Sequence, residues 1–566
     1  MQLEDKQNQN GEGHVEAASH VRSADEIFKE FKEHSVTEFF KKNSQMLGYA
    51  GKVRSLTTVV HEYVTNSLDA CEEAGILPEI TVTVKEIGEE KYSVTVSDNG
   101  PGIPKAHIGK ALGSVLKGTK FHRNMQQRGQ QGIGGSGCTL FAQITTGKPV
   151  HAKSNTGKEA YECDVSIDIR DNKPIVANMV QLPISQFKST GLEVTGFFAG
   201  VKYENSDHGV YEYLRRTALS NPHAHIVLHA PDGSTVDFPR SVDSMPKRPR
   251  ALKPHPLGMN VSDLMDFAKA SPSRKLSSFL VDSFSRITYD KVDELKKLVP
   301  DLDFNKAPGE LTWEEAEKLV DSFKKVKWLA PDLDALSTIG EKQIELAMRK
   351  ILNPEFMSVV ERRPKVFRGG IPFVVEAGIA YGGSAGTKTS TGTSGNVLRF
   401  ANKVPLLFDG GSCAITEAVQ EIDWKRYGIK NFDEEPVSVF VNVSSVYIPY
   451  SGVGKQAIAQ EEEIIDEIKL AVMEAARRLQ MHLSSERNKS EQASRYKTIM
   501  RYVEQLSSDL ADITSRNKSE IQKSLTQLIE SKYKSLFEDS SKESGQEADV
   551  AGSAGEEAEA DANANN

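Results

Sequence analysis

Two neighbouring segments of the chain alternate apolar and polar residues with a period of two, a pattern that suits a half-buried sheet. They are residues 80–87 (ITVTVKEI) and 91–98 (KYSVTVSD), separated by the turn sequence Gly-Glu-Glu. The alternation predicts an antiparallel hairpin with one buried face. More strands are predicted at residues 163–169, 191–198 and 225–229, among segments with helical periodicity. The first 240 residues therefore predict an α+β fold with a largely antiparallel sheet.

The middle of the chain changes character twice. Residues 244–258 are rich in Pro, Lys and Arg, and helical patterns follow to about residue 329. One of these helices is predicted to begin with the capping box Thr312-Trp-Glu-Glu315. Strand patterns return from residue 365, and the Gly-, Ser- and Thr-rich segment 382–396 between them predicts a flexible connection. A small helical module followed by a second α+β domain is predicted.

Helical periodicity dominates the sequence from residue 456 nearly to 536, with a predicted interruption near residues 484–490. Apolar residues late in this stretch alternate spacings of three and four, typical of a coiled-coil seam: Tyr496, Ile499, Val503, Leu506, Leu510 and Ile513. The seam predicts either intramolecular packing or a partner-binding helix. The chain is thus divided into a flexible arm (1–22), an α+β domain (23–240), a helical module (241–332), a second α+β domain (333–483), C-terminal helices (484–536) and a disordered acidic tail (537–566).

The charge of the chain is concentrated in its tail. The formal net charge is −9, but residues 538–566 hold nine acids and one lysine, a net −8, so the rest of the chain carries −1. A near-neutral body with basic clusters is compatible with nucleic-acid binding. Four well-separated cysteines with no CxxC pair predict neither a disulfide framework nor a zinc site. With no signal peptide or membrane-spanning run in the sequence, we expect a soluble, cytoplasmic protein.

Residues 61–75 (HEYVTNSLDACEEAG) predict an amphipathic helix with an unusual polar stripe. Glu62, Asn66, Asp69 and Glu73 fall on one helical face, opposite an apolar side. An Asn side-chain oxygen suits Mg²⁺, and a carboxylate one turn earlier can hold and deprotonate a water. Taken alone, a solvated helix face is the simpler explanation of the stripe.

Two glycine-containing segments follow the predicted strands. In SDNGPGIP, Asp98 ends a strand, and the glycines after it let the backbone come close to a flat ligand. The Asp98 carboxylate can accept a hydrogen bond from an exocyclic amine of that ligand. In RGQQGIGGSG (128–137), five glycines precede a predicted helix, whose first N–H groups suit a phosphate. Lys117-Gly-Thr119-Lys120 lies just upstream. An ordinary turn and a glycine-rich linker are the alternatives for each segment alone.

These three segments, in this order and within about eighty residues, resemble the N, G1 and G2 boxes of the GHKL (Bergerat-fold) ATPases. The resemblance implies an ATPase sandwich that binds ATP and Mg²⁺, with Glu62 as general base, Asn66 as magnesium ligand and Asp98 as the group that reads adenine. It also implies a set of further nucleotide-binding residues: Thr119, Lys120, Gly129, Gln130, Gln131, Gly132, Ile133, Gly134, Gly135 and Ser136.

Other segments are similar to the B-subunit family of the type IIB enzyme DNA topoisomerase VI. That family has a helix-two-turn-helix module after its ATPase domain, then an α+β transducer domain with a long C-terminal stalk helix. A transducer lysine of the family reaches the γ-phosphate, which implies Lys455, in YSGVGKQ, as a second catalytic residue. Thr65 departs from the family, which more often has aspartate there, and this departure concerns the fine tuning of the magnesium shell, not the family assignment. The similar segments include residues 36–49 (VTEFFKKNSQMLGY), 213–224 (YLRRTALSNPHA), 399–419 (RFANKVPLLFDGGSCAITEAV) and 424–428 (WKRYG).

The resemblance implies that ATP dimerises two copies of the chain and gates the passage of one DNA duplex through another, relaxing supercoils and decatenating DNA. The sequence context of a cleavage domain is missing, so the DNA-cleaving A subunit of topoisomerase VI is the implied partner, in an A2B2 heterotetramer and in contact with the C-terminal helices. Sequence-independent contacts to DNA phosphates are predicted from basic residues that also fit an ordinary surface: Arg215, Arg216, Lys247, Arg248, Arg250 and Lys425. The alternative function is a GHKL protein clamp of the chaperone or MutL type.

Overall fold

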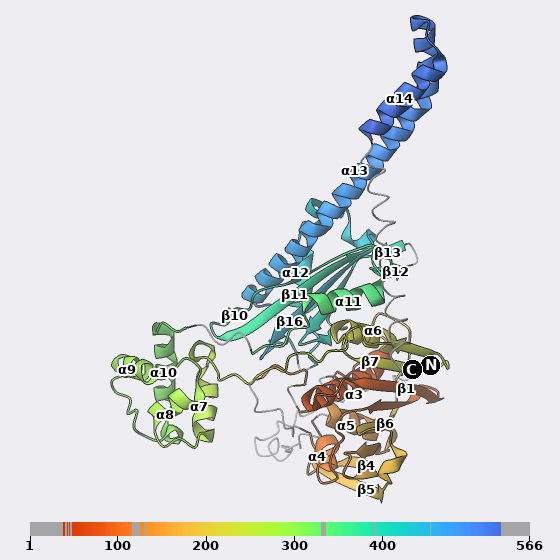
Figure 1. Ribbon diagram of the computed structural model, residues 1–566. Coiled ribbons are helices and arrows are strands. Elements are labelled where there is room, and N and C mark those ends of the chain that lie inside the picture. Colours follow the sequence, from red (N-terminus) through yellow and green to blue (C-terminus); the bar gives the residue numbers. More distant parts are fainter. Residues whose placement is uncertain are drawn as a thin grey trace, which may run out of the picture.

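The computed structural model describes residues 38–39, 42–43, 45, 48–115, 125–129, 132–329, 335–389, 392–452 and 454–533. The predicted arm and acidic tail lie outside the described residues. The described chain consists of a sheet covered by helices, a separate group of short helices, a second sheet, and a long helical projection from that second sheet (Figure 1).

The first sheet has eight strands: β1 Glu79–Gly88, β2 Lys91–Asp98, β3 Val150–Asn155, β4 Ala160–Asp168, β5 Lys173–Gln181, β6 Gly191–Ala199, β7 His225–His229 and β8 Thr235–Phe238. Their order is β5-β4-β3-β6-β2-β1-β7-β8. The predicted hairpin β1–β2 is antiparallel, with Val82 opposite Val96, while β1 and β7 run parallel. The predicted strands β1, β2, β4, β6 and β7 are confirmed, and β3, β5 and β8 are additional.

Among the described residues, this part of the chain contains four helices: α3 Lys52–Ala74, α4 Ile108–Gly113, α5 Gly134–Thr146 and α6 Val210–Ser220. The predicted helix of residues 61–75 is the second half of α3, which begins earlier because Leu56 and Val60 already continue its apolar face into the core. Burying each such side chain stabilises the fold by roughly 1.5–3 kcal/mol. The helix ends at Gly75, whose φ of 75° is left-handed and favours glycine.

The separate helical module contains α7 Val261–Ala270, α8 Leu276–Ser283, α9 Tyr289–Leu298 and α10 Trp313–Lys325. These helices form a hydrophobic core of their own around Phe279, Phe284 and Phe323. The predicted capping box is confirmed, because Thr312 Oγ1 accepts from the backbone of Glu315 and the Glu315 carboxylate accepts from the backbone of Thr312. In Figure 1 the module stands to one side of the first sheet.

The second sheet contains β9 Phe356–Glu361, β10 Lys365–Phe367, β11 Ile371–Tyr381, β14 Asn396–Ala401, β15 Val404–Pro405 and β16 Val437–Ser445. The strand order is β10-β11-β16-β14-β15, with β9 also paired to β11. Helix α11 (Glu341–Leu352) packs against this sheet in one hydrophobic cluster. Helix α12 (Ala414–Gln420) packs against the sheet in a second, separate cluster. The flexible connection predicted over residues 382–396 is wrong in part, because the strands β12 (Thr387–Thr389) and β13 (Gly392–Ser394) pair within it.

A single helix of 53 residues, α13 (Glu462–Thr514), packs its first turns on the second sheet and then projects away from it (Figure 1). At ~1.5 Å per residue it is about 80 Å long. The predicted interruption near residues 484–490 is wrong: this polar segment contains no Gly or Pro, so nothing in it breaks the helix. The chain turns at Ser515, whose φ is 54°, and α14 (Lys518–Lys532) packs back along α13.

The predicted seam of α13 is only partly covered. Val503 is 4% exposed, and the ring centroids of Tyr496 and Tyr533 lie 5.7 Å apart, but Ile513 remains 79% exposed.

Among the described helices, none is long and apolar enough to cross a membrane.

Candidate active site

One cavity of about 600 Å³ brings together residues that are distant in the sequence. Its walls include Glu62 and Asn66 of α3, Asp98 at the end of β2, and Lys455 from the segment before α13. The glycine-rich segment closes another side, with Gly129, Gly132, Ile133, Gly134, Gly135 and Ser136 among the lining residues. The volume matches that of small-molecule sites in general. The cavity therefore lies between the first sheet, two of its helices and a loop of the second α+β unit.

Asp98 is held by three donors. Ser67 Oγ donates to Oδ2 at 2.7 Å, and the backbone N–H groups of Gly100 and Leu192 donate to Oδ1 at 2.9 and 3.2 Å. Burial raises the pKa of Asp98, and these three hydrogen bonds act against that rise by stabilising the carboxylate. A cavity wall that includes Val96, Ile103, Leu192 and Val194 surrounds this carboxylate with apolar surface.

Glu62 and Asn66 face the first turn of α5. A Cβ atom at Gly134 would overlap the Glu62 carboxylate, and one at Gly135 would lie 3.5 Å from Asn66 Nδ2. The Glu62 carboxylate thus lies close to the α5 backbone at Gly134. The unpaired N–H groups at the start of α5 make this end of the cavity suitable for phosphate.

Lys455 reaches the cavity from the second α+β unit. Its backbone is left-handed, with φ of 52°, in a turn closed by a 3.1 Å bond from Lys455 N to Gly452 O. Burial lowers the pKa of His61, and the positive charge of Lys455 lowers it further, against the opposing effect of Glu62. His61, Glu62 and Lys455 all line the same cavity.

Two members of the predicted stripe do not share the position of Glu62 and Asn66. Asp69 is buried, is not among the residues that line the cavity, and accepts a 2.9 Å bond from Arg128. Glu73 is exposed and borders the cavity one turn beyond. Thr65 is also buried, with its hydroxyl 3.5 Å from that of Tyr213.

Four of the predicted nucleotide-binding residues lie outside the described residues: Thr119, Lys120, Gln130 and Gln131. Sequence reasoning missed Ser67, the N–H of Leu192, and the cationic or titratable pair His107 and Lys110, all of which border or support the cavity. Ser67 follows Asn66 directly, so the helical pattern contained it. The contribution of Leu192 is a backbone group, which carries no residue-type signal.

The predicted DNA-contact residues divide into buried and exposed groups. Arg215 and Arg216 form ion pairs with Glu212 at 2.7 and 2.6 Å, and their side chains are 17% and 9% exposed, which leaves them little surface for a phosphate contact. Lys247, Arg248 and Arg250 are exposed, and Arg248 donates a 2.8 Å bond to Glu73 O.

Lys425 is exposed on the 3-10 helix Trp424–Tyr427, beside exposed Arg426. The rings of Trp424 and Tyr427, on either side of these two basic residues, belong to the core of the second sheet and are 8% and 9% exposed. Only the basic residues of this loop therefore face solvent.

Comparisons with known proteins give matches along most of the chain. A family model described as "Histidine kinase-, DNA gyrase B-, and HSP90-like ATPase" matches residues 51–174, and one described as "Topoisomerase VI B subunit, transducer" matches residues 331–495. The B subunit of type 2 DNA topoisomerase 6 from Pyrococcus horikoshii is 46% identical over 557 residues, covering 90% of this chain and 97% of that protein. Its counterpart in Pyrococcus abyssi is 45% identical with the same coverage. Among solved structures, the ATPase region of Saccharomyces cerevisiae topoisomerase II aligns with 81% of this chain and 100% of its own, at 10% identity and a TM-score of 0.40.

Proposed function

This chain belongs to the B-subunit family of DNA topoisomerase VI, and we propose that it hydrolyses ATP to drive double-strand passage of DNA by a type IIB topoisomerase. The observation that carries the proposal is the convergence of Glu62, Asp98 and Lys455 on one cavity. ATP binding and hydrolysis can use all three groups. Glu62 is a carboxylate suited to act as a base, Asp98 is a carboxylate suited to accept from an amine, and Lys455 is a cation from the second α+β unit.

In this proposal the adenine lies against the apolar wall near Asp98, whose Oδ2 accepts from the exocyclic amine. The triphosphate extends toward the start of α5 and Lys455. Glu62 acts as the general base that orients a water and takes its proton, a role worth typically 10²–10⁴-fold in rate. The partly exposed carboxylate of Glu62, 29% accessible, supports the base assignment because water reaches it.

The chemistry of the donor set fits Mg²⁺ in part. Asn66 presents an exposed amide to the cavity beside the start of α5, and the described residues contain no group of three or more His, Cys, Asp or Glu side chains that could hold a metal ion. A magnesium ion would therefore be held by Asn66 together with phosphate oxygens and waters, as Mg²⁺ commonly is. When bound, Mg²⁺ supplies neutralisation of phosphate charge.

We further propose that Lys455 contacts the γ-phosphate and that the second α+β unit transmits nucleotide state along α13. Two copies of the chain dimerise on ATP, and each binds the DNA-cleaving subunit through the far ends of α13 and α14. The exposed Lys425 contacts duplex DNA. The packing of α13 on the second sheet supports this transmission along α13. The last strand of that sheet, β16, comes shortly before Lys455 in the chain.

The test is reconstitution of the chain with its DNA-cleaving subunit on supercoiled DNA. We expect ATP-dependent relaxation by the wild-type complex, and its loss in Glu62→Ala and Lys455→Ala. Robust relaxation by either variant would contradict its role, and ATP hydrolysis without relaxation by the complete complex would favour a protein clamp.

A further inference from the structure

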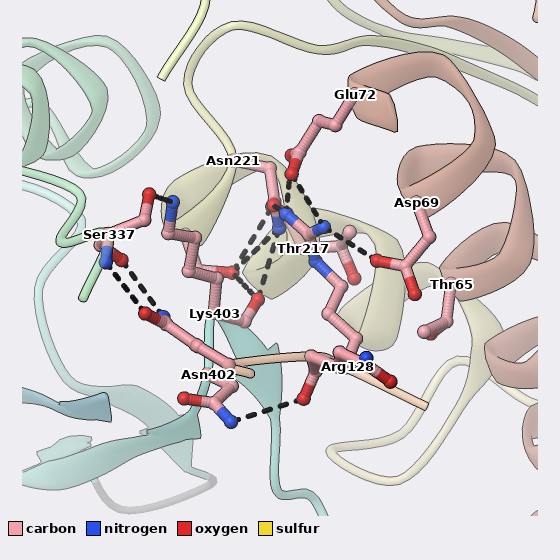
Figure 2. Close-up of polar contacts among 12 residues, drawn as sticks. Thr65, Asp69, Glu72, Arg128, Thr217, Asn221, Ser337, Asn402 and Lys403 are labelled. Atoms are coloured by element: carbon pink, nitrogen blue, oxygen red, sulfur yellow. Dashed lines mark hydrogen bonds and ion pairs between the residues drawn. The ribbon is translucent and has the colours of Figure 1, made fainter. Parts of the chain in front are cut away.

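Arg128, the first residue of the glycine-rich segment, is buried among carboxylates instead of facing the cavity. Its guanidinium donates to Asp69 at 2.9 Å, to Glu72 at 2.9 and 2.6 Å, and to Asn221 Oδ1 at 2.5 Å (Figure 2). Asp69 and Glu72 belong to α3, and Asn221 ends α6. The planar guanidinium carries five N–H donors in a rigid fork, so this one side chain binds Asp69, Glu72 and Asn221 together.

The contacts continue from Asn221 into the second α+β unit. Asn221 Nδ2 and Ser220 Oγ both donate to the backbone oxygen of Lys403, at 3.1 and 2.7 Å. Lys403 and Asn402 form the two-residue turn between β14 and β15, and both have left-handed backbones, with φ of 68° and 48°. A lysine in this conformation is held by its surroundings.

The residues before Arg128 contact the Asn402-Lys403 turn, both directly and through Ser337. Gln126 and Ser337 exchange two hydrogen bonds, of 2.9 and 2.7 Å, and the Lys403 ammonium donates to Ser337 Oγ at 2.8 Å. Asn402 Nδ2 donates to Gln127 O at 3.1 Å (Figure 2). We name this set the Gln126–Arg128 joint: Gln126, Gln127 and Arg128 with Asn402, Lys403 and Ser337.

The β14–β15 hairpin connects the joint to Lys455. Arg399 of β14 donates to Phe408 O at 2.9 Å and to Gln456 O at 3.4 Å, and Phe408 N donates to Gln456 Oε1 at 3.4 Å. Gln456 directly follows Lys455. The turn at one end of the hairpin is therefore held by the joint, and the other end holds the neighbour of the cavity lysine.

We propose that the Gln126–Arg128 joint is a positioning element that sets the place of Lys455 in the cavity through the β14–β15 hairpin. This inference rests on the proposed role of Lys455 at the γ-phosphate. The residues of the joint are not among those that line the cavity, so nucleotide affinity depends on them weakly, whereas the hydrolytic step depends on them through Lys455.

The test uses Asn402→Gly, because glycine keeps the left-handed turn and removes the side-chain bonds to Gln127 and Ser445. In the complex with the DNA-cleaving subunit on duplex DNA, we expect kcat for ATP to fall about tenfold while KM stays within twofold. Asn353→Gly is the matched control, since Asn353 is an exposed, left-handed residue (φ 41°) at the end of α11. We expect it to retain wild-type kcat.

A double variant separates positioning from a general structural role. In the Lys455→Ala background, followed by single-turnover hydrolysis, Asn402→Gly should cause no further loss. The proposal would be contradicted by an unchanged kcat in Asn402→Gly. It would also be contradicted if Asn402→Gly caused the same tenfold loss of hydrolysis rate with and without Lys455. If Asn402→Gly unfolds, Gln126→Ala takes its place with the same expected pattern. Wild-type hydrolysis by Lys455→Ala alone would instead contradict the proposed role of Lys455.

Discussion

Ser67 Oγ donates a 2.7 Å hydrogen bond to Asp98 Oδ2, so the helix that carries Glu62 also orients the carboxylate at the end of β2. The stretch of α3 from Glu62 to Ser67 thus contributes both the carboxylate near the start of α5 and the hydroxyl that binds Asp98. Because Ser67 stabilises the ionised form of a buried carboxylate, its removal should raise the pKa of Asp98 further.

The first prediction concerns the pH dependence of nucleotide affinity. If the Asp98 carboxylate accepts from adenine, affinity declines as pH falls through its raised pKa, because protonation removes the acceptor. In Ser67→Ala the decline should begin at a higher pH than in the wild type. Equilibrium binding of a non-hydrolysable ATP analogue across a pH series measures this, and superimposable profiles would contradict it.

Arg128→Met should destabilise the chain strongly. The substitution leaves the buried carboxylates of Asp69 and Glu72 without their cation, a loss of about 3–5 kcal/mol. Scanning calorimetry of the purified chain measures it. Arg362→Met is a matched control with a smaller expected loss, because Arg362 also pairs with two carboxylates, Glu467 and Glu474, but is more exposed.

The same variant should change the acid sensitivity of the fold. Arg128 and the other partners hold the pKa of Glu72 well below its ordinary value of 4.5, against the effect of burial. The stabilisation from Glu72 is therefore present at pH values above that ordinary pKa and is lost as pH falls toward the folded-state pKa. Wild-type stability should therefore drop more than that of Arg128→Met as pH falls below about 4.5, and equal drops would contradict this linkage.

Glu376, in the core of the second sheet, predicts the opposite pH dependence. Burial raises its pKa to about 7, although the backbone of Gly340 and the amide of Asn442 donate to it. The folded state then keeps a proton that the unfolded state releases, so Glu376 contributes a loss of stability as pH rises from about 4.5 to about 7. Glu376→Gln should remove this slope in calorimetric scans, and an unchanged slope would assign it elsewhere.

Lys425→Ala should weaken DNA binding in a salt-dependent manner. Loss of one phosphate contact lowers affinity for any sequence and reduces the slope of log K against log salt by about 1. Fluorescence anisotropy with duplex DNA at several salt concentrations measures both. Lys324→Ala, an exposed lysine of α10 paired with Asp321, is the control expected to keep the wild-type slope.

Apolar residues near the turn between α13 and α14 should bind the DNA-cleaving subunit. Ile513 and Leu528 are 79% and 65% exposed. Aspartate at both positions should weaken the association of the two polypeptides at least tenfold, as expected for central interface residues. Met481→Asp is the control, since Met481 is 66% exposed on the same helix but closer to the sheet. Titration by light scattering measures association, and equal losses in both variants would contradict the assignment.

Local pattern was enough to predict much of this protein. The alternation in β1 and β2, the glycine spacing before α5 and the capping box of Thr312 are short-range features, and each depends on residues within one turn or one strand pair. The order of the three ATPase-like segments, which resembles a known family, predicted the class of fold and several of the residues that border the cavity, Glu62, Asn66 and Asp98 among them.

Only the tertiary structure decided which partner each polar side chain meets. Glu62 and Asp69 lie on one predicted stripe, yet one borders the cavity and the other binds Arg128, because α5 packs against one part of α3 while the segment before the glycines packs against another. Helical periodicity assigns a face to a residue but cannot say which distant segment covers that face. The same reason applies to Lys455, whose place at the cavity depends on a hairpin and a joint formed by residues from both α+β units.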